Sequence, residues 1–258
     1  MNAIMGLIQW GEYMSWRLPK KCHLVMTANP SDGNYSTNID FDPAQQSRFL
    51  TLKADFDVNI WAKWAQTTGI SGTFINFALL TPEMFERGAH INSRSYTMFA
   101  NSLLGFSSFD TEETLEKACI LAKAAFNDDW VSGMFVQFVH NKLDKLIDPE
   151  QMLKGDWDKV KVLLEDNIYR NNGNYDASVA STLTIRFTNF IEDYFSTVST
   201  DKKKSETVIN RVLDLVTKID KTLLTEDLLF RMIKTLNAKY PTRCQKLLQY
   251  PAIRSKLL

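Results

Sequence analysis

Three polar residues lie at the ends of predicted strands or helices, where functional side chains are often found: Asn29, Arg48 and Arg94. Asn29 follows an apolar run that is predicted to be a buried strand. Arg48 lies at the exit of a short predicted helix, and Arg94 lies at the start of another. A guanidinium group stays protonated and presents planar donors to phosphoryl oxygens. Taken singly, each residue has an ordinary structural explanation, such as a turn, a helix end or an exposed surface.

Other catalytic and metal-binding patterns are missing from the sequence. It contains no GxSxG, no HExxH and no CxxC. The histidines are too scattered to predict a zinc site: His23, His90 and His140. The cysteines are widely separated and odd in number, which favours free thiols in a reducing compartment: Cys22, Cys119 and Cys244. We therefore expect a cytoplasmic protein.

Charge and hydropathy exclude further classes of protein. Among 258 residues, 30 Lys and Arg balance 30 Asp and Glu, so the net charge is zero. A balanced chain has no global attraction to nucleic acid or to an anionic membrane, and neither is expected as a partner. The 45% of hydrophobic residues argues against disorder. No apolar run approaches 18 residues, and the N-terminus does not read as a signal peptide.

The first 55 residues have the pattern of an α/β sheet. A helix is predicted over 3–10, an extended or hairpin segment over 12–18, and a buried strand over 23–27. Asp42, Pro43 and Gln45 then suit the start of a short helix, and a second strand is predicted over 49–52. Strand, loop, short helix and strand are typical of an α/β fold.

Beyond residue 55 the periodicity is almost entirely helical. Helices are predicted over 57–66 and 72–80, with further starts at Pro82, at Asp110 and at Pro149. The polar segment 170–174 contains glycine and reads as a linker. Three long amphipathic stripes follow it, the first of which is Val179, Leu183, Phe187, Ile191 and Tyr194.

The order of these motifs resembles the C-terminal part of an AAA+ ATPase module. The motifs are TANPxxGxY, then DPAxxSRF, then a tryptophan-bearing helix, then SRSYxxFxxxL, and residues 3 to about 106 carry the match. The resemblance is to the MoxR-like and dynein-related group, particularly its phage and bacterial versions. Segments around 129–138 and 148–153 also resemble the helical extension of those proteins.

The resemblance implies a role for each of the three polar residues. Asn29 corresponds to the sensor 1 residue, which holds the attacking water in line with the γ-phosphate. Arg48 corresponds to the arginine finger, which is donated across a subunit interface to the charged phosphoryl group. Arg94 corresponds to sensor 2 on the helical lid, and it acts on its own or on a neighbouring site. The implied cofactors are ATP and Mg²⁺, within a homo-oligomeric ring that remodels protein partners.

The sequence departs from the family in one large respect. None of its ten glycines belongs to a GxxxxGK[ST] loop, and no apolar strand ending in Asp-Glu precedes Asn29. The nucleotide and Mg²⁺ are therefore expected to bind only when a missing N-terminal half completes the site. Three explanations stay open: a fragment of a full ATPase, one half of a split ATPase, or a degenerate module kept as an adaptor.

The expected fold is mainly α, with a remnant of an α/β AAA+ core at its start. Residues 1–54 are expected to form that remnant with two strands, residues 55–108 a helical lid, and residues 109–258 an all-helical extension with a linker near 171–174. The predicted function is a partial AAA+ ATPase module, which is not competent alone. The alternative is a non-catalytic helical interaction or adaptor protein that binds a partner through an amphipathic groove.

Overall fold

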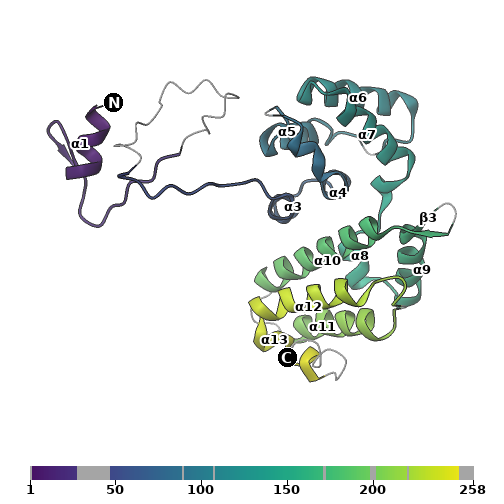
Figure 1. Ribbon diagram of the computed structural model, residues 1–258. Helices are drawn as coiled ribbons and strands as arrows, with labels where there is room; N and C mark the ends of the chain where they lie inside the picture. The colour runs from purple at the N-terminus through teal and green to yellow at the C-terminus, as the bar shows by residue number, and fades with distance from the viewer. Residues whose placement is uncertain are drawn as a thin grey trace. The chain divides into compact units, whose positions relative to one another are not determined.

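The computed structural model is mainly helical and divides into two compact units, Met1–Asp55 and Phe56–Leu258 (Figure 1). It describes residues 2–27, 47–88, 90–106, 108–170, 173–197, 202–219 and 221–249. The expectation of a mainly α protein is confirmed. The two units, called unit 1 and unit 2 below, are each described by themselves.

Unit 1 begins with a helix and a tight hairpin. Helix α1 spans Asn2–Trp10 and ends at Gly11, whose φ of +68° lies in the left-handed region that glycine adopts without strain. Strands β1 (Glu12–Tyr13) and β2 (Trp16–Arg17) then pair antiparallel, with Tyr13 opposite Trp16. The predicted helix and the predicted hairpin segment are both confirmed.

The two predicted strands of an α/β core are absent from the part of unit 1 that the structure describes. Residues 23–27 and 49–52 are irregular, and Leu50 is 90% exposed. The prediction of strands was wrong here because a strand needs a neighbour to bond its backbone groups, and no described segment pairs with either run. Residues 28–46, with the predicted loop and most of the short helix, lie outside the described residues.

The first half of unit 2 is an array of short helices. They are α3 (Val58–Thr67), α4 (Gly72–Leu80), the 3₁₀ helix η1 (Pro82–Glu86), α5 (Ser93–Ser102), α6 (Glu112–Phe126) and α7 (Asp129–His140). The predicted helices over 57–66 and 72–80 are confirmed, and Asp57 caps the first through its side chain. The predicted cap at Asp110 was wrong by one residue, since the Thr111 hydroxyl accepts from the Thr114 amide.

Aromatic rings fill the first core of unit 2. Phe74 and Phe135 stack with their planes 4° apart, while Phe77 meets Phe135 edge to face at 5.2 Å between ring centroids. Such pairs add to the stabilisation that burial itself provides. Helices α6 and α7 contribute to this core together with α3, α4 and α5. The core therefore runs past the expected lid boundary at residue 108.

The second half of unit 2 packs around a long helix, α10 (Ala177–Thr197). The elements before it are the 3₁₀ helix η2 (Leu143–Lys145), α8 (Pro149–Lys154) and α9 (Trp157–Ile168). Those after it are α11 (Lys202–Thr217), α12 (Glu226–Lys239), α13 (Pro241–Cys244) and the 3₁₀ helix η3 (Leu247–Gln249). Four of the five residues of the predicted stripe are fully enclosed on α10, namely Val179, Leu183, Phe187 and Ile191. The fifth, Tyr194, is half-buried, and Phe195 beside it is buried instead.

A short hairpin lies at the segment near 171–174 that was expected to be a linker. Strands β3 (Tyr169–Arg170) and β4 (Asn174–Tyr175) pair antiparallel, and residues 171 and 172 between them lie outside the described residues. Helices on both sides of the hairpin share the second core. Helix α10 also packs against α3 and α4, so it connects the second core to the first.

Candidate functional site

Arg94 lies in the first turn of α5 and its side chain is exposed. The turn is held by a capping box, in which Asn92 Oδ1 accepts from the amides of Arg94 and Ser95 at 3.0 and 3.1 Å. Ser95 Oγ in turn accepts from the Asn92 amide at 3.0 Å. These contacts fix where the helix starts, and so they fix the turn that presents the Arg94 guanidinium to solvent.

Tyr96, two residues further on, anchors the same turn in the core. Its side chain is fully buried, and its hydroxyl donates to the Phe74 carbonyl at 2.6 Å. Burial raises the pKa of Tyr96 well above its usual 10.0, so the hydroxyl stays a donor. Because Tyr96 and Phe99 face inward, Arg94 on the same helix points to the opposite, solvent side.

Arg48 is exposed in a turn of unit 1, over residues 47–49. Asn29 and the residue before it, which the predicted strand would deliver, lie outside the described residues. Arg48 and Arg94 belong to different units. The convergence of the three predicted residues on one nucleotide therefore stays a prediction.

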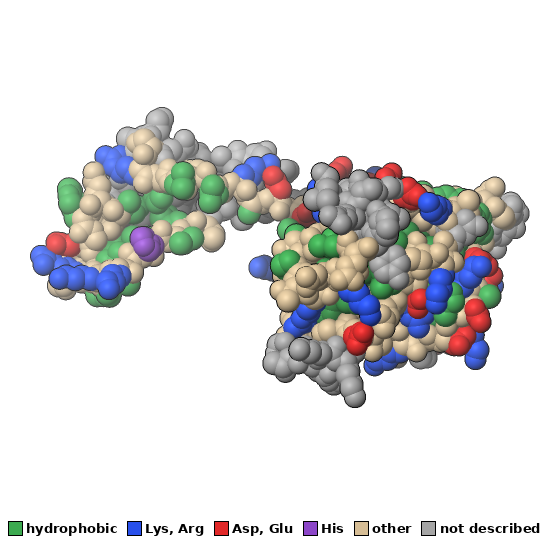
Figure 2. Space-filling model, turned by 90° about the horizontal axis from the view of Figure 1, so that it is seen from below, with side chains coloured by type: hydrophobic (Ala, Val, Ile, Leu, Met, Phe, Trp, Pro, Cys, Tyr) green, Lys and Arg blue, Asp and Glu red, His purple; other side chains and the backbone are tan. Residues whose placement is uncertain are grey.

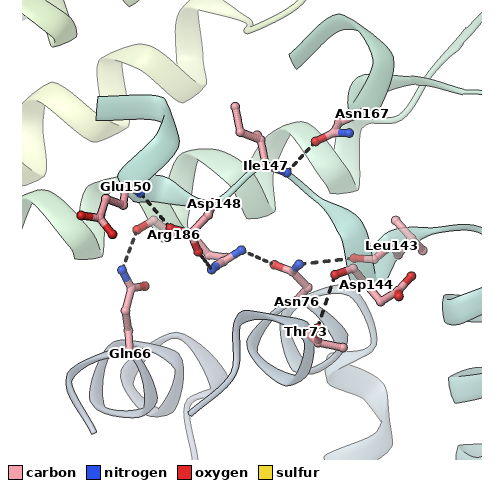
Figure 3. A network of polar contacts seen from close by, with 10 residues as sticks. All are labelled: Gln66, Thr73, Asn76, Leu143, Asp144, Ile147, Asp148, Glu150, Asn167 and Arg186. Carbon is pink, nitrogen blue, oxygen red and sulfur yellow. Dashed lines mark hydrogen bonds and ion pairs between the residues drawn. The ribbon is translucent and has the colours of Figure 1, made fainter. Parts of the chain in front are cut away.

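The structure places a buried charge where the sequence analysis saw only an apolar stripe. Arg186 on α10 is 3% exposed, and its guanidinium donates to Asn76 Oδ1 at 3.0 Å and to Asp148 Oδ2 at 3.3 Å (Figure 3). Asn76 Nδ2 donates onward to the Leu143 carbonyl at 3.3 Å. Burial lowers the pKa of Arg186 below its usual range, while the Asp148 carboxylate opposes that shift.

This network connects the two cores of unit 2 by hydrogen bonds and has a structural rather than a catalytic role. It links α4, α10 and the segment 143–148, and the neighbouring Ile147 amide donates to Asn167 Oδ1 at 2.8 Å (Figure 3). It contains no nucleophile with an adjacent base. The sequence did carry a signal for it, because Arg186 lies three residues after Leu183 and so falls on the buried face of its helix.

The thiols and acidic groups of the described residues form no chemical centre. Cys22 is exposed, Cys119 half-buried and Cys244 buried, and burial raises the pKa of the Cys244 thiol to about 11. A thiol with a raised pKa is a poor nucleophile. No group of three His, Cys, Asp or Glu side chains that could hold a metal ion occurs in the described ranges. Nor is any described helix both long and apolar enough to cross a membrane.

Comparison of this chain with family models, with curated proteins and with solved structures gave no match in any of the three. The function is therefore argued from the residues and their placement.

Proposed function

We propose that this chain supplies the sensor 1, arginine-finger and sensor 2 residues of an oligomeric, chaperone-like AAA+ ATPase, and that it does not hydrolyse ATP alone. The residues are Asn29, Arg48 and Arg94. The observation that carries the proposal is the order of the three motifs around them, TANPxxGxY, DPAxxSRF and SRSYxxFxxxL, in a single chain. The placement of Arg94 and the surface of unit 1 support it.

The exposure of Arg94 supports a phosphate-contacting role. Its guanidinium is exposed at the start of α5, in a turn held by a capping box and by the buried Tyr96. An exposed guanidinium presents planar donors to an anion that approaches from solvent. The helix N-terminus beside it adds a partial positive charge, which further favours an anionic ligand over a cationic one.

Unit 1 carries apolar side chains that its own described residues leave uncovered. Val25, Leu50 and Leu52 are each more than four-fifths exposed, in the two runs that read as buried strands. Figure 2 shows hydrophobic side chains gathered on one face of this unit. Strand-like apolar runs without partners are expected when the rest of a sheet comes from another polypeptide segment, as the missing ATPase half would provide.

The proposed roles follow from the chemistry of each side chain. The Asn29 amide would hold the attacking water in line, and the Arg48 guanidinium would donate to the phosphoryl oxygens of a neighbouring subunit's nucleotide. Arg94 would couple the position of its helix to the nucleotide state. The exposed guanidinium groups fit ATP phosphates, whereas no described acidic cluster fits Mg²⁺. The ion, which neutralises phosphate charge when bound, would be held by the other half.

The test joins the chain to a Walker-containing N-terminal half and measures ATP turnover. We expect turnover from the joined protein and none from the chain alone. Arg48→Ala should abolish turnover and leave nucleotide binding intact, because the finger acts in the transition state. The matched control is Arg17→Ala, which removes another exposed arginine of unit 1. Normal turnover in Arg48→Ala would remove the arginine-finger assignment.

A second candidate, a non-catalytic helical interaction protein, is favoured by the completeness of unit 2. Its two cores are closed by its own helices, and they need no residue of unit 1. Binding of a protein partner that is unaffected by Arg48→Ala and Arg94→Ala, together with no turnover in the joined protein, would favour this function over the first.

A further inference from the structure

A groove between α3, α10 and α12 combines a buried carboxylate with unused hydrogen-bond donors. Its cavity measures about 210 Å³ and lies wholly within unit 2. The lining residues on α10 run from Ser181 to Glu192, a length of roughly 16 Å at the rise of an α-helix. The cavity is smaller than the 300 to 1,000 Å³ typical of sites for drug-sized ligands, so it does not suit a nucleotide.

Glu192 organises one end of this groove. It is 3% exposed, and its Oε2 accepts from the ammonium groups of both Lys63 and Lys239, the latter at 2.7 Å. The hydrogen bond with Glu192 is the main reason why the pKa of Lys239 is raised, so this ammonium stays charged. A buried carboxylate between two lysines holds their ends at fixed positions in the groove.

The same lysines keep donors for a ligand. Each ammonium carries three N–H groups, and both side chains remain more than a third exposed. Asn189 Nδ2, one turn before Glu192, is buried and has no hydrogen-bond partner among the described residues. Because that nitrogen has almost no accessible surface, a ligand in the groove meets the ammonium groups of Lys63 and Lys239 instead. Arg231 on α12 also lines the groove, and it is exposed at the rim.

The charges in and beside the groove favour an anion. Its lining carries three cations, Lys63, Arg231 and Lys239, against one carboxylate, Glu192. The charge of Arg231 helps to lower the pKa of the nearby Asp57. The Asp57 carboxylate therefore offsets part of the positive charge of Arg231. The net charge of these five groups is still +1 (three minus two), and the excess lies beside Glu192, where two lysines meet one carboxylate.

Apolar side chains beside these donors indicate that the ligand also carries an apolar group. Ile60 on α3 is 70% exposed at the rim, while Leu228 and Met232 on α12 line the wall. An exposed isoleucine next to a charged cluster gains from burial by an apolar partner. The length of the groove matches about five residues of extended chain. A single small anion would leave the apolar wall uncovered.

We propose that this groove binds an acidic segment of a protein partner, with one carboxylate on Lys63 and Lys239 and an adjacent apolar side chain against Ile60. The proposal is independent of ATP hydrolysis, because no residue of the groove belongs to the proposed nucleotide site. It assigns a partner chemistry to unit 2.

The test measures binding of the full chain to a fluorescein-labelled hexapeptide of alternating Glu and Leu, by fluorescence anisotropy. The comparison peptide has Gln in place of Glu. We expect binding of the Glu peptide with Kd below about 1 mM, weakening as salt rises, and at least tenfold weaker binding of the Gln peptide. Equal binding of the two peptides, or none of either, would overturn the proposal.

Two variants locate the peptide in the groove. Lys239→Gln should weaken binding at least fivefold while leaving Glu192 paired with Lys63, and Arg231→Gln should weaken it less because Arg231 lies at the rim. Lys218→Gln, an exposed lysine of unit 2 outside the groove, is the control and should bind as the unmodified chain does. Circular dichroism checks that each variant is folded.

Two further measurements distinguish a peptide site from a site for free carboxylates and from the proposed nucleotide site. Glutarate should compete only at concentrations well above the peptide's Kd, because it cannot cover the apolar wall; competition at equal concentration would assign the site to free carboxylates instead. Arg48→Ala and Arg94→Ala should bind the peptide normally. Wild-type binding by both Lys239→Gln and Arg231→Gln would place the peptide elsewhere and overturn the proposal.

Discussion

Units 1 and 2 differ in what encloses their apolar side chains. None of residues 6–27 and 47–55 of unit 1 is buried, although they include Leu24, Val25 and Leu50. Unit 2 instead encloses two hydrophobic clusters, and rings such as Phe77 and Phe135 have no exposed surface. Both units are built from ordinary apolar residues, so composition does not account for the difference.

The difference reflects how each kind of backbone meets its hydrogen-bonding needs. A helix bonds its own N–H and C=O groups within one segment, and then needs only another apolar face to pack against. A strand leaves these groups unpaired until a second strand lies beside it. Unit 2 encloses its cores with its own helices, whereas the described runs 23–27 and 49–52 of unit 1 form no strand.

The largest expected effect comes from the first core of unit 2. Phe135→Ala removes a ring that stacks on Phe74 and meets Phe77 edge to face, so we expect a loss of about 3 to 5 kcal/mol in the free energy of unfolding. Urea unfolding followed by circular dichroism measures it. Met98→Ala on the exposed side of α5 is the control, with little change. A small loss in Phe135→Ala would contradict the closed core described for unit 2.

A smaller effect is expected where the two cores of unit 2 meet. A Cβ at Gly72 would lie 2.5 Å from Arg186 Nη2, and this atom cannot move away without losing its bond to Asp148. Gly72→Ala should therefore destabilise by about 1 to 3 kcal/mol. In the Arg186→Leu variant, Gly72→Ala should lower the free energy of unfolding by measurably less. Equal costs in both backgrounds would show that the contact with Arg186 is not the cause.

The cap at the start of unit 2 should have a pH-dependent effect of about 1 kcal/mol. The Asp57 carboxylate accepts from the Asn59 amide at 2.7 Å, and this bond lowers the pKa of Asp57 below its usual 3.8. A lowered pKa means that the stabilisation is present above pH 4 and is lost as the pH falls through the folded-state value. Asp57→Ala should thus cost stability at pH 7 and lose that difference near pH 2. Asp55→Ala, two residues earlier, is the control.

The smallest effect is expected in unit 1. Leu50→Ser replaces a side chain that is 90% exposed, so the thermal midpoint of the chain should not change. The same substitution in the protein joined to a Walker-containing half should lower the midpoint, if the run 49–52 then becomes a buried strand. A drop in the chain alone would mean that this leucine is enclosed by unit 1 itself, and the contrast between the units would fail.

Much of the helical fold was predictable because its signals are local. The helix over 72–80 begins and ends as predicted, and Asp57, Pro82 and Pro149 mark the starts of elements through capping or a preset φ. The exposure of Arg94 also follows locally, since Tyr96 and Phe99 occupy the opposite face of α5. The absence of strands over 23–27 and 49–52 was not predictable, because an apolar run carries no information about whether a partner strand is present.

The sequence by itself determined where most helices begin and which faces they bury, because caps and periodicity act over a few residues. Only the tertiary structure decided that Arg186 reaches Asn76 and that Glu192 binds Lys63, contacts that join positions 110 and 129 residues apart. Such pairs arise from the packing of α10 against α3 and α4, and no local pattern encodes which distant side chain a buried charge will meet.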